Sequence, residues 1–441
     1  MKKYLLIPLA IVLVSALIFG GCKPAPKGPE EILVGSPASL TGMFAGFGVG
    51  QIFGAQAAVD DINAQGGVYV EEYGHKLPIK LVVVNDESDP LKVAALAEDL
   101  VVREKVHVLV SGNNPPPMHL GVANIAQRYK IPHLARPAVM EPWLGMRAEI
   151  TPPWEYTWAT GFSIVAGAPE GDFRYQVPGY TDLDTWVAVL DGVLDQTNKR
   201  VGVFATDEPD GRAWYALFSS PLQEIGLTIS GIDKELGLFP IGNTDFTPII
   251  REWMADDVDI LWGNCPAPDF GTLWRQAHAL GFQPKVVFVG RAPCNYVDII
   301  AWGGNLPHGV CVEMQWNPAY DSHGIGDTTP QSLTARWTEA TGDPVNFNIG
   351  LGYYLIQVLI DAIERAGTLD AEALNKAIGE TDLMTMNWRV KFDENQWSVD
   401  ALSFGQWHKV DAPHQWEMKI VASQHEFIKP DADFIFPVPY D

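Results

Sequence analysis

Residues 32–63 read ILVGSPASLTGMFAGFGVGQIFGAQAAVDDIN and indicate the fold class of this chain. The apolar run Ile32–Ser36 predicts a buried strand. A glycine-rich turn follows it, and residues 50–64 predict a helix with one apolar face. Gly66 and Gly67 end that helix. A strand, a turn and a helix in this order are typical of the first unit of an α/β fold.

The same alternation continues along the chain. Further apolar strands are predicted at 79–84, 106–110, 131–134, 200–205, 228–232, 260–263, 286–290 and 309–314, with helices between them. Strands that are apolar throughout are typical of a parallel sheet covered by helices on both faces. Helices are also predicted at 330–341 and 348–366, and the second is apolar on most sides, which favours a deeply packed position. Because the pattern restarts near residue 200, we predict two α/β lobes.

The N-terminus has the pattern of a secretory leader. Two lysines precede an apolar run over 4–19, which is followed by Gly20-Gly21-Cys22. We predict a signal peptide over 1–21, an acylated Cys22 and a proline-rich tether over 22–31. An uncleaved membrane anchor is the alternative, because the apolar run is close to the length that spans a bilayer.

Composition excludes several classes of function. The chain has 30 basic and 54 acidic side chains and a net charge of −24, which argues against nucleic acid as a partner. Cys265, Cys294 and Cys311 form no C-x-x-C pair and no cluster with histidines, so no metal site is predicted. Cys265 and Cys294 both follow predicted strands. A disulfide between them and three free thiols both remain open.

No catalytic or cofactor motif is present. Gly46-Phe47-Gly48-Val49-Gly50 follows a strand, but Phe53 occupies the third glycine position of a dinucleotide fingerprint. We therefore predict no cofactor and interpret the glycines as a flexible turn. Acidic pairs such as Asp60-Asp61 are interpreted as solvated surface, and we predict that the protein is not an enzyme.

Several segments resemble the branched-chain amino-acid-binding family of periplasmic solute receptors. They are SLTGMFAGFG (39–48), GAQAAVDDINAQGGV (54–68), LPIKLVVVNDESDP (77–90), TDFTPIIREWMADDVDILWGNC (244–265), LWRQAHALGF (273–282), IGLGYYLIQVLIDAIERAGTLD (349–370) and KFDENQW (391–397). The resemblance covers roughly residues 32–423. It implies two Rossmann-like lobes with parallel sheets, joined by three hinge crossings and closing around a small solute.

The resemblance also implies the organisation and the role of the protein. Lobe 1 is expected at 32–157 and 317–398, and lobe 2 at 158–316 and 399–441, with a surface strap from 427 onward. We expect an extracytoplasmic, lipid-anchored monomer that delivers a solute to an ABC permease in the membrane. A sensor ectodomain with a separate signalling partner and an α/β enzyme are the alternatives.

The resemblance suggests candidate positions for the ligand site. Phe47 matches an aromatic residue of the family's cleft wall, and Asp210 stands where the family has a tyrosine. The segments that hold a ligand carboxylate in the family read Asn113-Asn114-Pro115-Pro116 and Arg136-Pro137-Ala138-Val139 here. The candidate ligand-binding residues are Phe47, Asn113, Asn114, Arg136, Ala138, Trp158, Asp210, Asn264 and Arg291.

Two departures from the family bear on the ligand class. The segment that carries the family's ammonium-binding acid reads GRAPCN at 290–295 and contains no acid. Arg136 and Arg291 offer guanidinium groups that pair well with carboxylates, unless they face solvent or bind a structural acid. We therefore expect an organic acid or amide to be preferred over leucine, isoleucine or valine.

Two further features are interpreted from the sequence. Trp143, Trp154, Trp158, Trp262 and Trp316 lie near predicted cleft loops, where they supply either aromatic walls or core packing. Residues 166–181 have the look of an insertion relative to the family, either over the cleft rim or as a surface loop.

Overall fold

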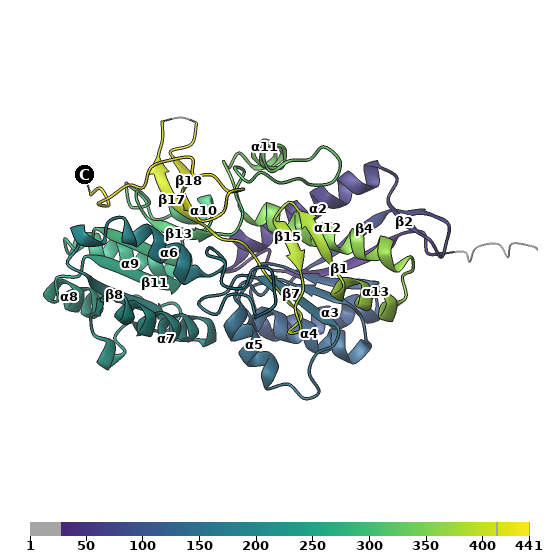
Figure 1. The fold of residues 1–441 in the computed structure, drawn as a ribbon, viewed down its shortest axis with the longest axis horizontal. Helices are drawn as coiled ribbons and strands as arrows, with labels where there is room; N and C mark the ends of the chain where they lie inside the picture. The colour runs from purple at the N-terminus through teal and green to yellow at the C-terminus, as the bar shows by residue number, and fades with distance from the viewer. Residues whose placement is uncertain (1–27, 412, 441) are drawn as a thin grey trace, which may run out of the picture.

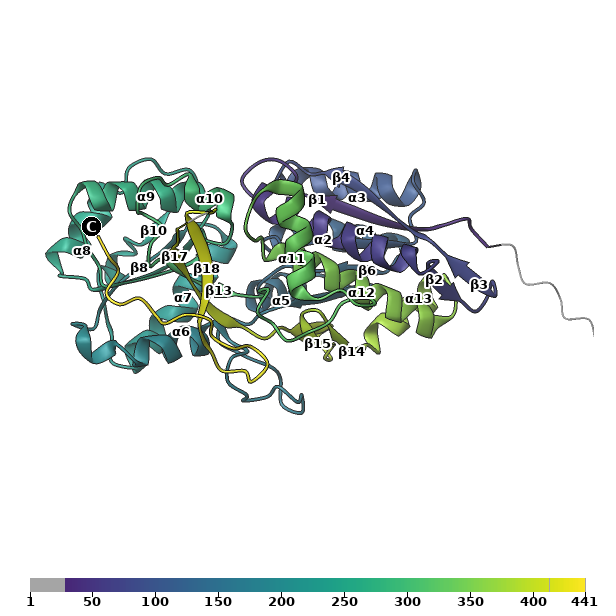
Figure 2. The same cartoon turned by 90° about the horizontal axis from the view of Figure 1, so that it is seen from above.

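The computed structural model describes residues 28–411 and 413–440, which form two α/β lobes lying end to end (Figures 1 and 2). The predicted signal peptide and Cys22 lie outside the described residues. Each lobe has its own sheet, and the chain passes from one lobe to the other and back. The predicted fold class, with two lobes and parallel sheets, is confirmed.

The first lobe contains a six-stranded, all-parallel sheet of order β16-β7-β6-β5-β1-β4. Its strands are β1 (Ile32–Ala38), β4 (Ile79–Asn85), β5 (Val108–Ser111), β6 (His133–Ala135), β7 (Thr157–Gly161) and β16 (Trp397–Val399). The helices of this part are α2 (Ala45–Ala64), α3 (Pro90–Val102), α4 (Pro117–Tyr129), α5 (Met140–Ala148), α11 (Pro330–Thr341), α12 (Asn348–Ala366) and α13 (Ala371–Gly379). Two hairpins pair β2 (Val68–Val70) with β3 (His75–Leu77) and β14 (Asp382–Thr385) with β15 (Trp388–Lys391).

The second lobe has an eight-stranded sheet of order β10-β8-β11-β12-β13-β17-β18, with β9 beside β8. Its parallel strands are β8 (Arg200–Thr206), β9 (Thr228–Ile229), β10 (Leu238–Phe239), β11 (Ile260–Cys265), β12 (Val286–Arg291) and β13 (Cys311–Met314). Strands β17 (Ser403–Lys409) and β18 (Trp416–Ser423) complete the sheet in antiparallel pairing. The helices are α6 (Asp182–Asp191), α7 (Pro209–Glu224), α8 (Thr247–Ala255), α9 (Ala267–Ala279) and α10 (Tyr296–Ile300), with short 3₁₀ turns at Leu194–Gln196 and Ile232–Lys234.

The glycine-rich segment at 46–50 is helical, so the interpretation as a flexible turn was wrong. Helix α2 begins at Ala45 and includes it. Its glycines allow close packing instead: a Cβ on Gly48 would lie 2.2 Å from the carbonyl oxygen of Ser39. Helix α12 packs against α2, and its middle is buried on nearly every side, as predicted.

The ends of the strands indicate where the chain crosses from one sheet to the other. Strand β7 stays in the first sheet as far as Gly161, and β16 stays there as far as Val399. The lobe limits at 157/158 and 398/399 would therefore cut β7 and β16, and we propose crossings after Gly161, Met314 and Val399. The segment from Phe427 to Tyr440 runs over the second lobe, where Val438 N donates to Lys285 O at 3.0 Å.

The inserted segment 166–181 is attached to the first lobe through one buried arginine. Arg174 pairs with Asp172 (Nη2 to Oδ2, 2.7 Å) and donates to the carbonyl oxygens of Val399 and Lys391. Phe173 remains partly exposed, with the guanidinium of Arg389 4.4 Å from the centre of its ring. The segment is thus bound at the third crossing and is more than a free surface loop.

Candidate functional site

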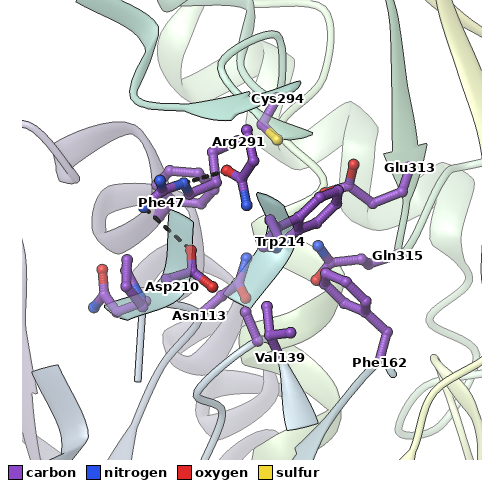
Figure 3. Close-up of a pocket in the computed structure, with 14 residues that line it drawn as sticks. Phe47, Asn113, Val139, Phe162, Asp210, Trp214, Arg291, Cys294, Glu313 and Gln315 are labelled. Carbon is purple, nitrogen blue, oxygen red and sulfur yellow. Dashed lines mark hydrogen bonds and ion pairs between the residues drawn. The ribbon is translucent and has the colours of Figure 1, made fainter. Parts of the chain in front are cut away.

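A pocket lies between the two lobes, at the carboxyl ends of strands from both sheets (Figure 3). The empty space between its side chains, including the part open to solvent, is about 410 Å³. Ligands of open α/β sheets bind outside the carboxyl ends of the strands, in the crevice that forms where the strand order reverses. The lining residues are Phe47, Asn113, Asn114, Pro115, Ala138, Val139, Phe162, Asp210, Trp214, Asn264, Arg291, Cys294, Glu313 and Gln315.

The first lobe contributes the loop after β5 to the pocket. Side chains of α2 and α12 fix this loop by hydrogen bonds. Asn113 N donates to Gln51 Oε1 of α2, and Asn113 Nδ2 donates to Asn348 Oδ1 of α12 at 2.9 Å. Both of these hydrogen bonds depend on the close contact of α2 with α12. The ring of His119 contacts the carbonyl oxygen of Asn114 at 3.2 Å. Burial lowers the pKa of His119 to about 3, so this imidazole is neutral and serves as a fixed support.

Two pocket residues have left-handed backbone conformations. Ala138, after β6, has φ +58°, and Arg291, the last residue of β12, has φ +66°. Such conformations cost free energy for residues other than glycine and are concentrated at ligand sites. Phe162 N donates to Ala138 O at 2.8 Å, which holds the first crossing against this turn.

Arg291 is fully engaged by protein groups. Its Nε donates to Asn264 Oδ1, and its Nη2 donates to Thr206 Oγ1 at 2.7 Å and Glu208 Oε1 at 2.9 Å. Its Nη1 lies 3.2 Å from Asp210 Oδ2. Every nitrogen of this guanidinium therefore has a partner, so it does not present a free fork to a ligand carboxylate.

Two buried carboxyl groups line the same pocket. Burial raises the pKa of Asp210 to about 6, although the charge of Arg291 opposes this shift. Burial also raises the pKa of Glu313 to about 8, with a further contribution from the charge of Asp210. Segment 290–295 supplies no acid, as expected, but the candidate Asp210 on α7 and Glu313 on β13, which the sequence did not suggest, bring carboxyl groups to the pocket.

Arg136 lies behind the pocket lining rather than in it. Its side chain has no exposed surface and pairs with Asp400 (Nη2 to Oδ2, 2.9 Å). It also donates to Gln315 Oε1 at 2.8 Å and to Asn113 Oδ1 at 3.4 Å. Arg136 thus orients two amides of the pocket and is itself neutralised by a structural acid, one of the alternatives that the sequence left open.

Trp158 does not line the pocket either. It lies on β7, and its Nε1 donates to Asn375 Oδ1 of α13 at 2.9 Å. Trp143 and Trp154 stack on one another, Trp262 lies in the core of the second lobe, and Trp316 packs against Gly350. The aromatic walls are instead Phe47, Phe162 and Trp214.

The remaining sequence candidates meet in the pocket. Phe47, Asn113, Asn114, Ala138, Asp210, Asn264 and Arg291 all line it. Sequence reasoning missed Phe162, Trp214, Glu313 and Gln315. Phe162 and Gln315 follow strands directly and Glu313 lies within one, so the carboxyl-end rule for parallel strands was the available signal.

The three described cysteines, Cys265, Cys294 and Cys311, are buried free thiols, so the disulfide left open by the sequence is not formed. Among residues 28–411 and 413–440, no helix combines the length and the apolar character that crossing a membrane requires. Within the same part of the chain, no three acidic, histidine or cysteine side chains are grouped so that they could hold a metal ion.

Two parallel-sheet lobes with a pocket at the facing strand ends define a two-lobed solute-binding protein. The family model described as periplasmic binding protein matches residues 31–409, and the chain belongs to that family. A Leu/Ile/Val-binding protein of Rhizobium johnstonii is 25% identical over 426 residues, covering 94% of this chain and 99% of the relative. A leucine-, isoleucine-, valine-, threonine- and alanine-binding protein of Pseudomonas aeruginosa is 21% identical, covering 90% and 95%.

Solved structures have the same fold. A leucine-binding protein from Thermotoga maritima aligns with a TM-score of 0.65 at 21% identity, over 89% of this chain and 99% of its own. A solute-binding protein of an ABC transporter from Rhodopseudomonas palustris, in complex with 3,4-dihydroxybenzoic acid, aligns with a TM-score of 0.67 at 19% identity, over 91% and 99%. These two ligands differ in charge and shape, so the fold alone does not define the ligand of this chain.

Proposed function

We propose that this protein is the extracytoplasmic solute receptor of an ABC importer. It captures a small organic solute in the pocket between its lobes and presents it to a membrane permease. The observation that carries the proposal is the composition of the pocket: Asn113 and Ala138 come from the first lobe, whereas Asp210, Asn264 and Arg291 come from the second. A ligand held by both sets of residues bridges the lobes.

Such bridging links binding to closure. Separating the lobes would expose both halves of the pocket, and a ligand that contacts both halves favours the closed arrangement by its differential affinity. Closure then removes the ligand from water and gives the permease a conformation to recognise. Membership of the periplasmic binding protein family and the transporter components among the structural neighbours support this role.

Calorimetry on the mature protein tests the receptor role. We expect one solute per chain and recovery of the solute unchanged after binding, because burial raises the pKa of the pocket thiol Cys294 well above its usual value and keeps this nucleophile protonated. A ligand at a hundredfold excess over Kd should stabilise the protein by about 2.7 kcal/mol. Chemical conversion of the bound solute would contradict the proposal, as would the absence of any stabilising solute in a panel of acids, amines, amides and sugars.

We also propose that acylated Cys22 anchors the mature chain to the membrane, which the leader and Gly20-Gly21-Cys22 support. Cys22→Ala should release the protein or leave it unprocessed, with a changed mature mass. Denatured wild-type protein extracted from membranes should titrate as three thiols, Cys265, Cys294 and Cys311, because thioether formation blocks the fourth. Four thiols, or unchanged membrane retention of Cys22→Ala together with an unchanged mature mass, would contradict this.

A further inference from the structure

Three oxygen atoms in the pocket are buried without a hydrogen-bond partner among the described residues. They are Asn114 Oδ1, Asp210 Oδ1 and Glu313 Oε2. Leaving a buried acceptor unpaired costs free energy, and native structures contain few such atoms. Three of them in one pocket indicate a missing partner that donates hydrogen bonds, and the unpartnered donors Asn264 Nδ2 and Trp214 Nε1 of the same pocket indicate that this partner also carries an acceptor.

The charges around the pocket also favour a ligand that donates hydrogen bonds. Arg291 is paired with Glu208 and Asp210, and Arg136 is paired with Asp400. Glu313 adds a further carboxyl group, and no cation is paired with it among the described residues. The immediate surroundings therefore hold more carboxyl groups than guanidinium groups. An anion entering this space would find no free guanidinium, whereas an ammonium ion would be a cationic partner for the carboxyl groups of Asp210 and Glu313.

We propose that the ligand of this pocket is an organic ammonium ion without a free carboxylate, namely an amine or an amino amide. This inference rests on the proposed function and specifies its substrate class. Asp210 Oδ1, Glu313 Oε2 and Asn114 Oδ1 are the acceptors that the pocket offers to the N–H groups of such a ligand. This ligand class differs from the organic acid expected from the sequence, because both arginines are engaged by acidic side chains of the protein.

The free amide donors of the pocket fit a neutral carbonyl on the same ligand. Asn264 Oδ1 accepts from Arg291, which leaves Asn264 Nδ2 without a partner in the described structure. Gln315 Oε1 accepts from Arg136, so the Nε2 of this pocket residue (Figure 3) is not the atom engaged by that guanidinium. Two neutral N–H donors can hold an amide carbonyl but give a carboxylate no cationic partner.

The walls of the pocket fit the rest of such a ligand. Phe47 approaches from the first lobe and Trp214 from the second, with Phe162 at the crossing between them. Aromatic faces bury an apolar body and also attract an adjacent ammonium ion through their π-systems. An amine with an aliphatic or aromatic body therefore satisfies both the walls and the carboxyl groups.

Pairs of probes with the same apolar body, in which only one member is an ammonium ion without a carboxylate, test the inference. The pairs are 3-methylbutylamine with 3-methylbutanoate, 2-phenylethylamine with phenylacetate, and leucinamide with leucine. Calorimetry on the mature protein at pH 7.5 should give, in at least one pair, a Kd for the ammonium probe at least tenfold lower than that of its partner. The inference is overturned if no pair shows this tenfold difference, and equally if none of the amines binds.

Variants connect the effect to the named carboxyl groups. Glu313→Gln should weaken the bound amine at least tenfold, while Glu252→Gln, on the outer helix α8, should leave its Kd unchanged. Equal Kd values for Glu313→Gln and the wild type would overturn the inference. Failure of the proposed function has a separate signature, because it would show as no stabilisation by any solute of the wider panel, whereas binding without the tenfold difference in any pair refutes the ligand class alone.

Discussion

Arg136 Nη2 and Asp400 Oδ2 lie 2.9 Å apart, and both side chains are buried. Arg136 follows β6, while Asp400 follows β16 at the third crossing between the lobes. The same guanidinium nitrogen contacts Gln315, which follows β13 at the second crossing. One arginine thus fixes two crossings to the first sheet and also orients the pocket.

Asp400→Asn should destabilise the protein by about 3 kcal/mol, because removing one member of a buried ion pair leaves the other charge uncompensated. Urea denaturation at pH 7.5 measures the change. The matched control is Asp99→Asn in the exposed pair with Arg103, where about 0–1 kcal/mol is expected. Equal effects of the two substitutions would show that the buried pair contributes no more than an exposed one.

The ligand-free protein should lose stability as pH rises from about 5 to 8. Burial raises the pKa of Asp210 to about 6 and that of Glu313 to about 8. In this window the folded state keeps protons that the unfolded state has released, so the free energy of unfolding falls with pH. Thermal unfolding across this range should show a smaller loss in Glu313→Gln than in the wild type. Identical slopes would contradict the shift assigned to Glu313.

Gly54→Ala should prevent the normal packing of α2 on α12. A Cβ at Gly54 would lie 1.7 Å from the carbonyl oxygen of Ile349, so the two helices would have to separate. We expect a loss of at least about 3 kcal/mol or failure to fold, since overpacking strains the backbone. The control is Gly145→Ala in α5, where a Cβ meets nothing within 4 Å. Denaturation of this control should show unchanged or slightly raised stability.

Arg174→Ala should loosen the inserted segment 166–181. The substitution removes the ion pair to the nearly buried Asp172 and the contacts with the crossing at Val399. Limited proteolysis should then cut within 166–181 faster than in the wild type, because local opening becomes less costly. Arg212→Ala, which removes an exposed ion pair with Asp207, is the control and should leave the cleavage rate unchanged. Equal cleavage in both variants would argue against the role of Arg174.

Much of the fold could be predicted from local patterns. Helices at Pro330–Thr341 and Asn348–Ala366 match the predicted ranges, because proline or glycine marks their ends and their apolar residues are periodic. Strands β2, β3 and β14 and the short helices α5, α6 and α13 were missed, since three to ten residues give too little periodicity. The glycines of 46–50 were misread because their role is contact with Ser39 and Asn346, which lie outside the segment.

Site residues at the ends of strands could be predicted from the sequence. The ion pairs that these residues form in the pocket could not. Asn113, Asn264 and Arg291 each end or follow a parallel strand, so they reach the pocket as expected. The environment of Arg291 could not be inferred, because Glu208 and Asp210 meet it from a neighbouring loop and helix. Their proximity is set by the strand order, which a single sequence does not specify.

The strand order also has a consequence for biogenesis. The first sheet is completed by β16 at Trp397–Val399, and the second by β17 and β18, which end at Ser423. Neither lobe can finish its sheet until these late strands, from residue 397 onward, have been synthesised. Non-local pairings of this kind form slowly. We therefore expect neither lobe to close before residues 397–423 are available for pairing.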